Sequence, residues 1–376
     1  MRFLHIADTH LGFSMYRKVT ADGVNQREMD VYNAFQQIID YAIETKPDFI
    51  LHAGDLFDSV RPNNRAISFA IHQLLRLSKE KIPFIVIAGN HEHPRLKETG
   101  HIFSLLDHIE YIYPVYRSTY EKINLNINGE VVTIHAIPQT YSAEEFQGTL
   151  RTLKPDDSDY NILLLHGSIS EIKEFSMREF NELLIPRYIL TMDFNYIALG
   201  HYHIYTRVTR NTFYSGSTET LSFAEAGSKK GFIEVSIDKN KSTPIFKPLS
   251  TRPVVDLPPI NCLDLSVDKV MEEASKIIQS INLRDSIVRL TFENLPMHVY
   301  KSIDFHRIRE EAREAFHFEV KTTTLGNTME QLDGGTKIDV LSEEFRRYLA
   351  AQRIQDKEEL LKLGLSYLNK IEGVQH

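Results

Sequence analysis

Five short apolar runs in this 376-residue chain each end in residues that commonly bind metals, and this ordered pattern constrains the fold more than any other feature. Runs of this length bounded by turn residues are typical of buried strands. In chain order they are Phe3–Ala7 before Asp8 and His10, Asp48–Ala53 before Asp55, Phe84–Ala88 before Asn90 and His91, Ile162–Leu165 before His166, and Tyr196–Leu199 before His201 and His203. Ligands at the carboxyl ends of neighbouring strands can converge on one crevice. The sequence therefore predicts an α/β fold with a dinuclear metal site at that edge.

The donor atoms indicate which cations such a site would hold. The carboxylate of Asp55 has two oxygens and can bridge two metals, and the Asn90 side chain offers a carbonyl oxygen. Cys262 is the only cysteine, so the ligand set is free of thiolates. Mixed oxygen and nitrogen donors suit Mn²⁺, Fe or Zn²⁺, and a hard site favours Mn²⁺. Gly54 and Gly89 would let the chain turn tightly after its strands.

Spacing predicts how some of these side chains point. Asp8 and His10 are two residues apart, as are His201 and His203, so we expect extended backbone to aim both members of each pair the same way. Two metals about 3.5–4 Å apart clamp the attacking and leaving oxygens of an in-line phosphoryl displacement.

Three further residues next to the motifs have possible chemical roles. His91 follows Asn90 and is placed to protonate a leaving oxygen, with a further metal ligand or a supporting group as the alternative. Asp58 and Glu92 each follow a ligand closely and are candidates for fixing imidazole tautomers. The alternative for both is ordinary surface charge.

Composition limits the partners. The formal net charge of −8 argues against a nucleic-acid binder, which is usually basic, but bound metals would add positive charge where a phosphate sits. Basic residues in the loops after the ligand strands are candidate DNA contacts, or else ordinary solvated side chains: Arg17, Arg27, Arg61 and Arg95. We find no leader segment and no apolar stretch long enough to cross a membrane. A single cysteine fits a reducing cytoplasm, with nucleoid association if the source is prokaryotic.

The order of predicted elements suggests three parts. Apolar residues at helical spacing in 28–45 and 64–80 alternate with strands, which implies parallel pairing, and Asn128-Gly129 predicts a hairpin. A parallel half joined to a more antiparallel half predicts a two-sheet sandwich flanked by helices, over residues 1–250. A proline-rich connection (PLSTRPVVDLPPI) then leads to a small α/β module at 251–330, followed by a helical segment at 331–376.

The last segment, 339–371, is expected to form two helices. Leu361, Leu365 and Leu368 recur there at helical spacing. Little remains for a terminal helix pair to cover, so this face is either a partner site or folds back on its own domain.

Taken together, the motifs resemble the calcineurin-like metallophosphoesterase superfamily. Within it, the chain is similar to the nuclease subunits of the DNA double-strand-break repair complex, the archaeal counterparts of bacterial SbcD. Three stretches strengthen this resemblance: HIADTHLGF at 5–13, NQREMD at 25–30, and YSGSTETLSFAEAGSKKGF at 214–232 followed by RPVVDL at 252–257.

The resemblance implies a role for each motif. One metal would take Asp8, His10, Asp55 and His203, the other Asp55, Asn90, His166 and His201, and His91 would be the catalytic histidine. It also implies a manganese-dependent 3′-to-5′ exonuclease on duplex ends and endonuclease on single strands, with residues 251–330 as a DNA-binding cap. Such nucleases are typically dimers, and they bind an SMC-like coiled-coil ATPase through helices after the cap.

Two departures and two rival functions remain. The third motif ends in Glu92 where these nucleases more often have Asp, and Asp58 stands where some have His, which would alter the balance of the two nuclease activities. One rival is a metallophosphatase or small-molecule phosphodiesterase. Protein phosphatases carry an arginine soon after the second motif, whereas here Ser59 and Val60 follow Asp58. The other rival is a non-catalytic scaffold that binds DNA ends.

Overall fold

The computed structural model describes residues 1–170, 172, 181–238, 241–324 and 360–361. Leu365 and Leu368, two of the three predicted partner contacts, lie outside the described residues, and Leu361 is half-buried. The chain divides into two compact units. Unit 1 comprises the described residues of Met1–Pro258, Glu272–Leu290 and Asp304–Glu319, and unit 2 comprises Pro259–Met271, Thr291–Ile303 and the described residues from Val320 onward.

Two six-stranded sheets form the body of unit 1. The first has the order β14-β13-β1-β2-β3-β4. Its strands are β1 (Arg2–Ile6), β2 (Phe49–His52), β3 (Phe84–Ile87), β4 (Ile112–Val115), β13 (Gly231–Asp238) and β14 (Lys241–Pro248). The four strands from β1 to β4 are parallel, as the alternation of strands and helices predicted. Strand β13 pairs antiparallel with β1, and β14 pairs antiparallel with β13.

The second sheet contains more parallel pairing than the expected, more antiparallel half suggested. Its order is β11-β12-β10-β7-β6-β5. Its strands are β5 (Glu121–Ile127), β6 (Glu130–Ile137), β7 (Tyr160–His166), β10 (Tyr196–Gly200), β11 (Thr206–Arg207) and β12 (Thr212–Tyr214). The inner pairs β6-β7, β7-β10 and β10-β12 are parallel, and only the edges are antiparallel. The reason is burial, because β7 and β10 are covered on both faces, as parallel strands usually are.

The predicted hairpin is confirmed at one of those edges. Strands β5 and β6 pair antiparallel up to Ile127 and Glu130, and Asn128-Gly129 forms the two-residue turn. Both turn residues have positive φ, 55° and 92°. This is the backbone that the type I′ turn requires.

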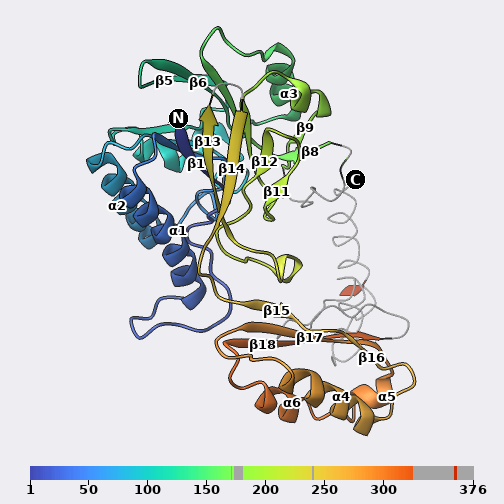
Figure 1. Cartoon of the computed structure of the whole chain (residues 1–376). Helices are drawn as coiled ribbons and strands as arrows, with labels where there is room; N and C mark the ends of the chain where they lie inside the picture. The colour runs from blue at the N-terminus through green and yellow to red at the C-terminus, as the bar shows by residue number, and fades with distance from the viewer. Residues whose placement is uncertain (171, 173–180, 239–240, 325–359, 362–376) are drawn as a thin grey trace. The chain divides into compact units, whose positions relative to one another are not determined.

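Alternation along the strands creates the layers. In β1, Phe3 packs into the core between the two sheets, whereas Leu4 and Ile6 face the helices α1 (Gln26–Thr45) and α2 (Asn64–Lys79). Figure 1 shows these two helices side by side along the first sheet. Helix α3 (Ala143–Thr152) packs through Phe146 and Leu150 onto the outer face of the second sheet. The predicted two-sheet sandwich with outer helices is confirmed.

The segment after residue 251 contains the elements of a small α/β module. Strands β15 (Val254–Asp256) and β16 (Ile260–Asn261) pair in parallel with β17 (Ile287–Leu295), and β18 (His317–Thr324) also pairs with β17. Its helices are α4 (Val267–Gln279), α5 (Met297–Tyr300) and α6 (Phe305–Glu311). The predicted boundaries at 250 and 330 stay predictions. Among the described residues, no helix is long and apolar enough to cross a membrane.

Candidate metal centre

Residues at or just after the ends of β1, β2, β3, β7 and β10 meet at the carboxyl ends of these strands. The structure brings all seven predicted ligands together there, and six of them lie in groups whose ligand atoms are within 4.8 Å of one another: Asp8, His10 and His203; Asp55, His166 and His201. The seventh, Asn90, has its Oδ1 2.9 Å from His166 Nε2. We call the set of Asp8, His10 and His203 the His203 half, and the set of Asn90, His166 and His201 the His166 half. Asp55 lies between them.

The backbone at the ligands is not extended, so this part of the spacing argument is wrong. Asp8 and His10 have φ of 52° and 46°, and His201 has φ of 95°. The chain has already left β1, and the amides of Asp8 and His10 bond to the carbonyls of Gly54 and Asp55. This bonding fixes the left-handed conformation, which aims the side chains into the site instead of along a strand.

The glycines before the ligands act mainly by leaving space. Gly54 has φ of +95°, as a tight turn requires, but Gly89 does not have a positive φ. A Cβ at Gly54 would lie 2.3 Å from His166 Nδ1, and a Cβ at Gly89 would lie 2.2 Å from Asp55 Oδ1. Both positions therefore exclude any side chain, because the ligands occupy that volume.

Unshared electron pairs face one another in the His166 half. His166 Nδ1 lies 2.8 Å from the carbonyl oxygen of Ala53, which can only accept, so Nδ1 carries the proton and Nε2 the lone pair. That Nε2 lies 2.9 Å from Asn90 Oδ1 and 3.2 Å from Asp55 Oδ2. With this tautomer of His166, the buried Asp55 Oδ2 has no hydrogen-bond donor among the described residues. These atoms repel one another unless positive charge lies between them, so they fit a divalent cation.

In the His203 half, too, unshared electron pairs face one another and fit a divalent cation. His203 Nδ1 lies 3.1 Å from Glu225 Oε1 and donates to it, which leaves the Nε2 lone pair facing His10 Nε2 at 3.3 Å. Asp55 Oδ2 is 3.8 Å from His10 Nε2. Carboxylate and imidazole donors without sulfur suit Mn²⁺, Fe or Zn²⁺.

Partners outside the centre orient the imidazoles of the His203 half, and sequence reasoning missed most of them. Asp58 Oδ1 lies 3.2 Å from His10 Nδ1, but the two atoms form no hydrogen bond, so its role in fixing the His10 tautomer stays a prediction. Glu225 holds His203 and is itself bound by the buried Lys230, whose Nζ lies 2.5 Å from Glu225 Oε2. Burial alone would raise the pKa of Glu225, but the hydrogen bond from His203 and the charges of His203 and Lys230 hold it well below its usual value. Such outer partners raise ligand basicity and fix ring orientation.

The His166 half is oriented differently. His166 donates to the backbone of Ala53, while His201 Nε2 lies 3.0 Å from Glu182 Oε1. Burial lowers the pKa of His166, but the charge and hydrogen bond of Asp55 and the charge of Asp8 together raise it to about 9. A proton therefore occupies this position readily when no cation does. No sequence signal pointed to Glu182, since it lies in no apolar run.

His91 sits against both the ligands and Asp58. Its backbone amide donates to Asp55 Oδ1 at 3.0 Å, and its Nδ1 lies 3.1 Å from the carbonyl oxygen of Asp58. Its ring meets that of His10 edge-on with centroids 4.6 Å apart. Its ligand atom also falls within 4.8 Å of those of His10 and Asp55, so the geometry allows either proton transfer or metal binding.

Glu92 does not fix a histidine tautomer, and it is not surface charge either. It is fully buried, and its Oε1 accepts from the amide of Gly89 at 2.8 Å. Burial and the charge of Asp55 raise the pKa of Glu92 to about 8. The reason for the correction is geometric, because the side chain turns back under its own loop and braces the Gly89 backbone.

One of the four predicted DNA contacts needs correction. Arg17, Arg61 and Arg95 are exposed, which is compatible with the prediction. Arg27 is only 1% exposed and its guanidinium binds Asp30, at 2.8 Å, and the carbonyl of Thr220. It is therefore not available to a nucleic acid.

Buried carboxylates and imidazoles at the ends of parallel strands define a metal-dependent phosphoesterase. Residues 1–205 match the calcineurin-like phosphoesterase family, which is more than half of the chain, so the chain belongs to this family. As a member of this family it uses divalent metal ions.

Within this family, the chain is similar to particular curated proteins. The chain is similar to the "DNA double-strand break repair protein Mre11" of Methanococcus maripaludis, at 28% identity over 95% of this chain and 91% of that protein. The Mre11 proteins of Sulfolobus acidocaldarius (31% identity, 75% of this chain, 70% of that one) and Methanocaldococcus jannaschii (33%, 59% and 57%) also match. The family resemblance drawn from the motifs is confirmed.

Proposed function

We propose that this phosphoesterase is a DNA nuclease that acts in double-strand-break repair. The observation that carries the proposal is the convergence of seven ligand side chains, with His91 beside them, at one sheet edge. The names of the similar proteins support DNA as the substrate.

The finer parts of the proposal come from the family resemblance. The enzyme would use two Mn²⁺ ions per subunit, one in each half of the centre. It would cut duplex ends 3′-to-5′ and single strands internally, as a homodimer. Residues 251–330 would bind DNA, and the segment 339–371, with Leu361, would bind an SMC-like coiled-coil ATPase. It would work in the cytoplasm, at the nucleoid in a prokaryote.

The residues divide the work of phosphodiester hydrolysis. Divalent metals held in the two halves would withdraw charge from the phosphate and lower the pKa of the attacking water. Asp55 keeps the halves at a fixed separation because its carboxylate lies between them. His91 donates Nδ1–H to the Asp58 carbonyl, so in the imidazolium form its Nε2–H would be the group that gives a proton to the leaving oxygen.

The test replaces His91 with Asn. We expect normal metal content and a loss of DNA cleavage of about 10²- to 10⁴-fold, the usual worth of a positioned general acid. End-labelled duplex and circular single-stranded DNA would be assayed with Mn²⁺, Mg²⁺ or EDTA, beside a phosphomonoester. The matched control is His108→Asn, because His108 is an exposed histidine.

Two outcomes would contradict the proposal. Undiminished cleavage by His91→Asn would remove the role of His91, and lost metal would make it a ligand instead. Fast monoester hydrolysis with intact DNA would favour a phosphatase.

A further inference from the structure

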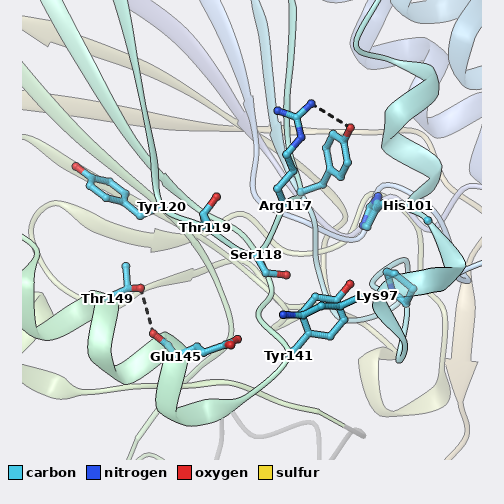
Figure 2. A pocket seen from close by; sticks show the side chains of 12 residues that line it. Lys97, His101, Arg117, Ser118, Thr119, Tyr120, Tyr141, Glu145 and Thr149 are labelled. Carbon is cyan, nitrogen blue, oxygen red and sulfur yellow. Dashed lines mark hydrogen bonds between the residues drawn. The ribbon is translucent and has the colours of Figure 1, made fainter.

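A cavity opens next to the loop that carries His91. Its volume is about 640 Å³, within the range of pockets that enclose small organic ligands. Figure 2 shows its wall, which combines rings and cations from separate segments: Lys97, His101, Tyr116, Arg117, Tyr120 and Tyr141. All of these residues belong to unit 1. The mechanism proposed above uses none of them.

The rings and the cations are paired. Lys97 Nζ lies 5.0 Å from the centroid of the Tyr141 ring, and the Arg117 guanidinium lies 5.3 Å from that of Tyr116. Tyr116 and Tyr141 are half-buried, and Lys97 and Arg117 are exposed. Aromatic faces next to cations are the surface on which bases of single strands stack and their phosphates bind.

One donor in the wall lacks a partner. His101 Nδ1 accepts from the amide of Phe103 at 3.1 Å, so the proton of the neutral ring is on Nε2. That Nε2 is buried and makes no hydrogen bond to the described residues. An unmade hydrogen bond of this kind is unfavourable, but the buried atom is not accessible from the cavity, so it does not contribute to ligand binding. Hydroxyls of Ser118 and Thr149 also line the cavity.

The cavity is joined to the metal centre through His93. This histidine follows His91 by two residues, its Nε2 lies 2.9 Å from Ser118 Oγ, and its ring meets Tyr141 edge-on at 4.5 Å. Pro94, the next residue, lines the cavity. Pro94 is three residues from His91, and three residues of chain span at most about 10 Å. Neighbouring nucleotides of one strand can therefore reach both the metal centre and the cavity.

We propose that this cavity binds a nucleoside monophosphate unit, with the base against Tyr141 or Tyr116 and the phosphate at Lys97 and Arg117. The inference rests on the proposed nuclease function, which brings a strand to the metal centre. The unit is an unpaired nucleotide of that strand, or a nucleotide released from it. The same chemistry recognises both, and the experiment separates them.

The experiment measures binding of a short fluorescent oligothymidylate by anisotropy in EDTA, where cleavage cannot proceed. We expect Tyr141→Ala to weaken binding about tenfold, the usual effect of removing one stacking platform. Tyr141→Phe should keep most of the affinity, because the ring remains. The matched control is Tyr188→Ala, since Tyr188 is 46% exposed and lies outside the cavity. Lys97→Ala adds a second variant at an exposed position.

Two further titrations show whether the bound nucleotide belongs to the strand or has been released from it. They also distinguish failure of the cavity proposal from failure of the nuclease proposal. Thymidine monophosphate that competes with the oligonucleotide in a Tyr141-dependent way, while inorganic phosphate does not, supports a site for the released nucleotide. The affinity for an oligonucleotide with one abasic position is measured in the same way. If Tyr141→Ala no longer lowers that affinity, the cavity binds a base of the strand. Equal affinities of Tyr141→Ala, Lys97→Ala and Tyr188→Ala for both probes would overturn the inference. Wild-type protein that binds thymidine monophosphate through Tyr141 but cleaves no DNA would uphold the cavity and contradict the nuclease.

Discussion

The two halves of the metal centre use similar ligands but hold them in different ways. In the His203 half, both histidines face carboxylates, His10 facing Asp58 and His203 facing Glu225, and the latter is locked by a buried lysine. In the His166 half, one histidine is held by Glu182 and the other by the carbonyl of Ala53. A carboxylate makes the histidine that it binds more basic than a carbonyl does. A side-chain carboxylate can also be removed by substitution, whereas a backbone carbonyl cannot.

This difference separates metal affinity from fold stability. Glu225 and Lys230 are both buried, so the His203 half is tied to the interior by an ion pair. Glu182 is partly exposed, and among the described residues it binds His201 and the hydroxyl of Ser168. We therefore expect the first half to couple metal binding to folding and the second half to do so much less. Four predictions test this, in order of expected effect.

The largest effect should come from Asp55→Asn, which removes the carboxylate that both halves share. Hydrolysis of bis(4-nitrophenyl) phosphate should fall about a thousandfold, because several kcal/mol of charge stabilisation by the metals is lost. Metal content measured by mass spectrometry should fall in parallel. Asp157→Asn, at an exposed position, is the control. Full metal content in the variant would show that Asp55 does not join the halves.

Glu225→Gln should weaken metal binding and folding together. Loss of an outer carboxylate typically reduces metal affinity about 10- to 100-fold. The variant also leaves Lys230 without its carboxylate, and breaking a buried pair costs about 3 kcal/mol. Thermal unfolding of the metal-free protein should show the second effect. Adding Lys230→Met should restore part of the stability but not the affinity, and full recovery of both would refute the separation.

Glu182→Gln is the matched change in the other half. Metal affinity should again fall about 10- to 100-fold, but at one site only, as a calorimetric titration with Mn²⁺ would resolve. The unfolding temperature of the metal-free protein should change little. A loss of stability as large as that of Glu225→Gln would mean that the two halves are anchored alike.

The smallest effect concerns pH in the metal-free protein. The pKa of His166 is raised to about 9 from an ordinary value of 6.5, so protonated His166 stabilises the fold below pH 6.5. That stabilisation is lost as pH rises through 9. The unfolding temperature should therefore decrease as the pH rises from 6.5 to 9. Saturating metal should remove this decrease, because the cation replaces the proton. A flat profile without metal would contradict the raised pKa.

The sequence predicted the parts of the site that depend on local order. Each ligand follows a buried apolar run, and parallel pairing of these strands is a topological rule, so convergence of the ligands was foreseeable. Asp58 was singled out in the same way, since it lies close to Asp55 in the chain, and its role stays a prediction.

The missed features depend on contacts between distant segments. Arg27 is buried because the carbonyl that it binds belongs to Thr220, far away in the sequence. Glu225 lies in the 214–232 stretch, but its role depends on a pairing with His203 that spacing does not show. The second half was expected to be more antiparallel because its hairpin is conspicuous, whereas the parallel pairing of β7 with β10 leaves no comparable local signal.

The left-handed backbone at Asp8, His10, Asp55 and His201 has a consequence for directed evolution. Residues other than glycine pay about 1–2 kcal/mol for this conformation, although Asp and His tolerate it better than most. Selection for heat resistance alone would tend to place glycine at these four positions, and selection for turnover would forbid it. The same four positions would therefore carry different residues after the two kinds of selection. Sequencing the surviving variants would show which selection had acted.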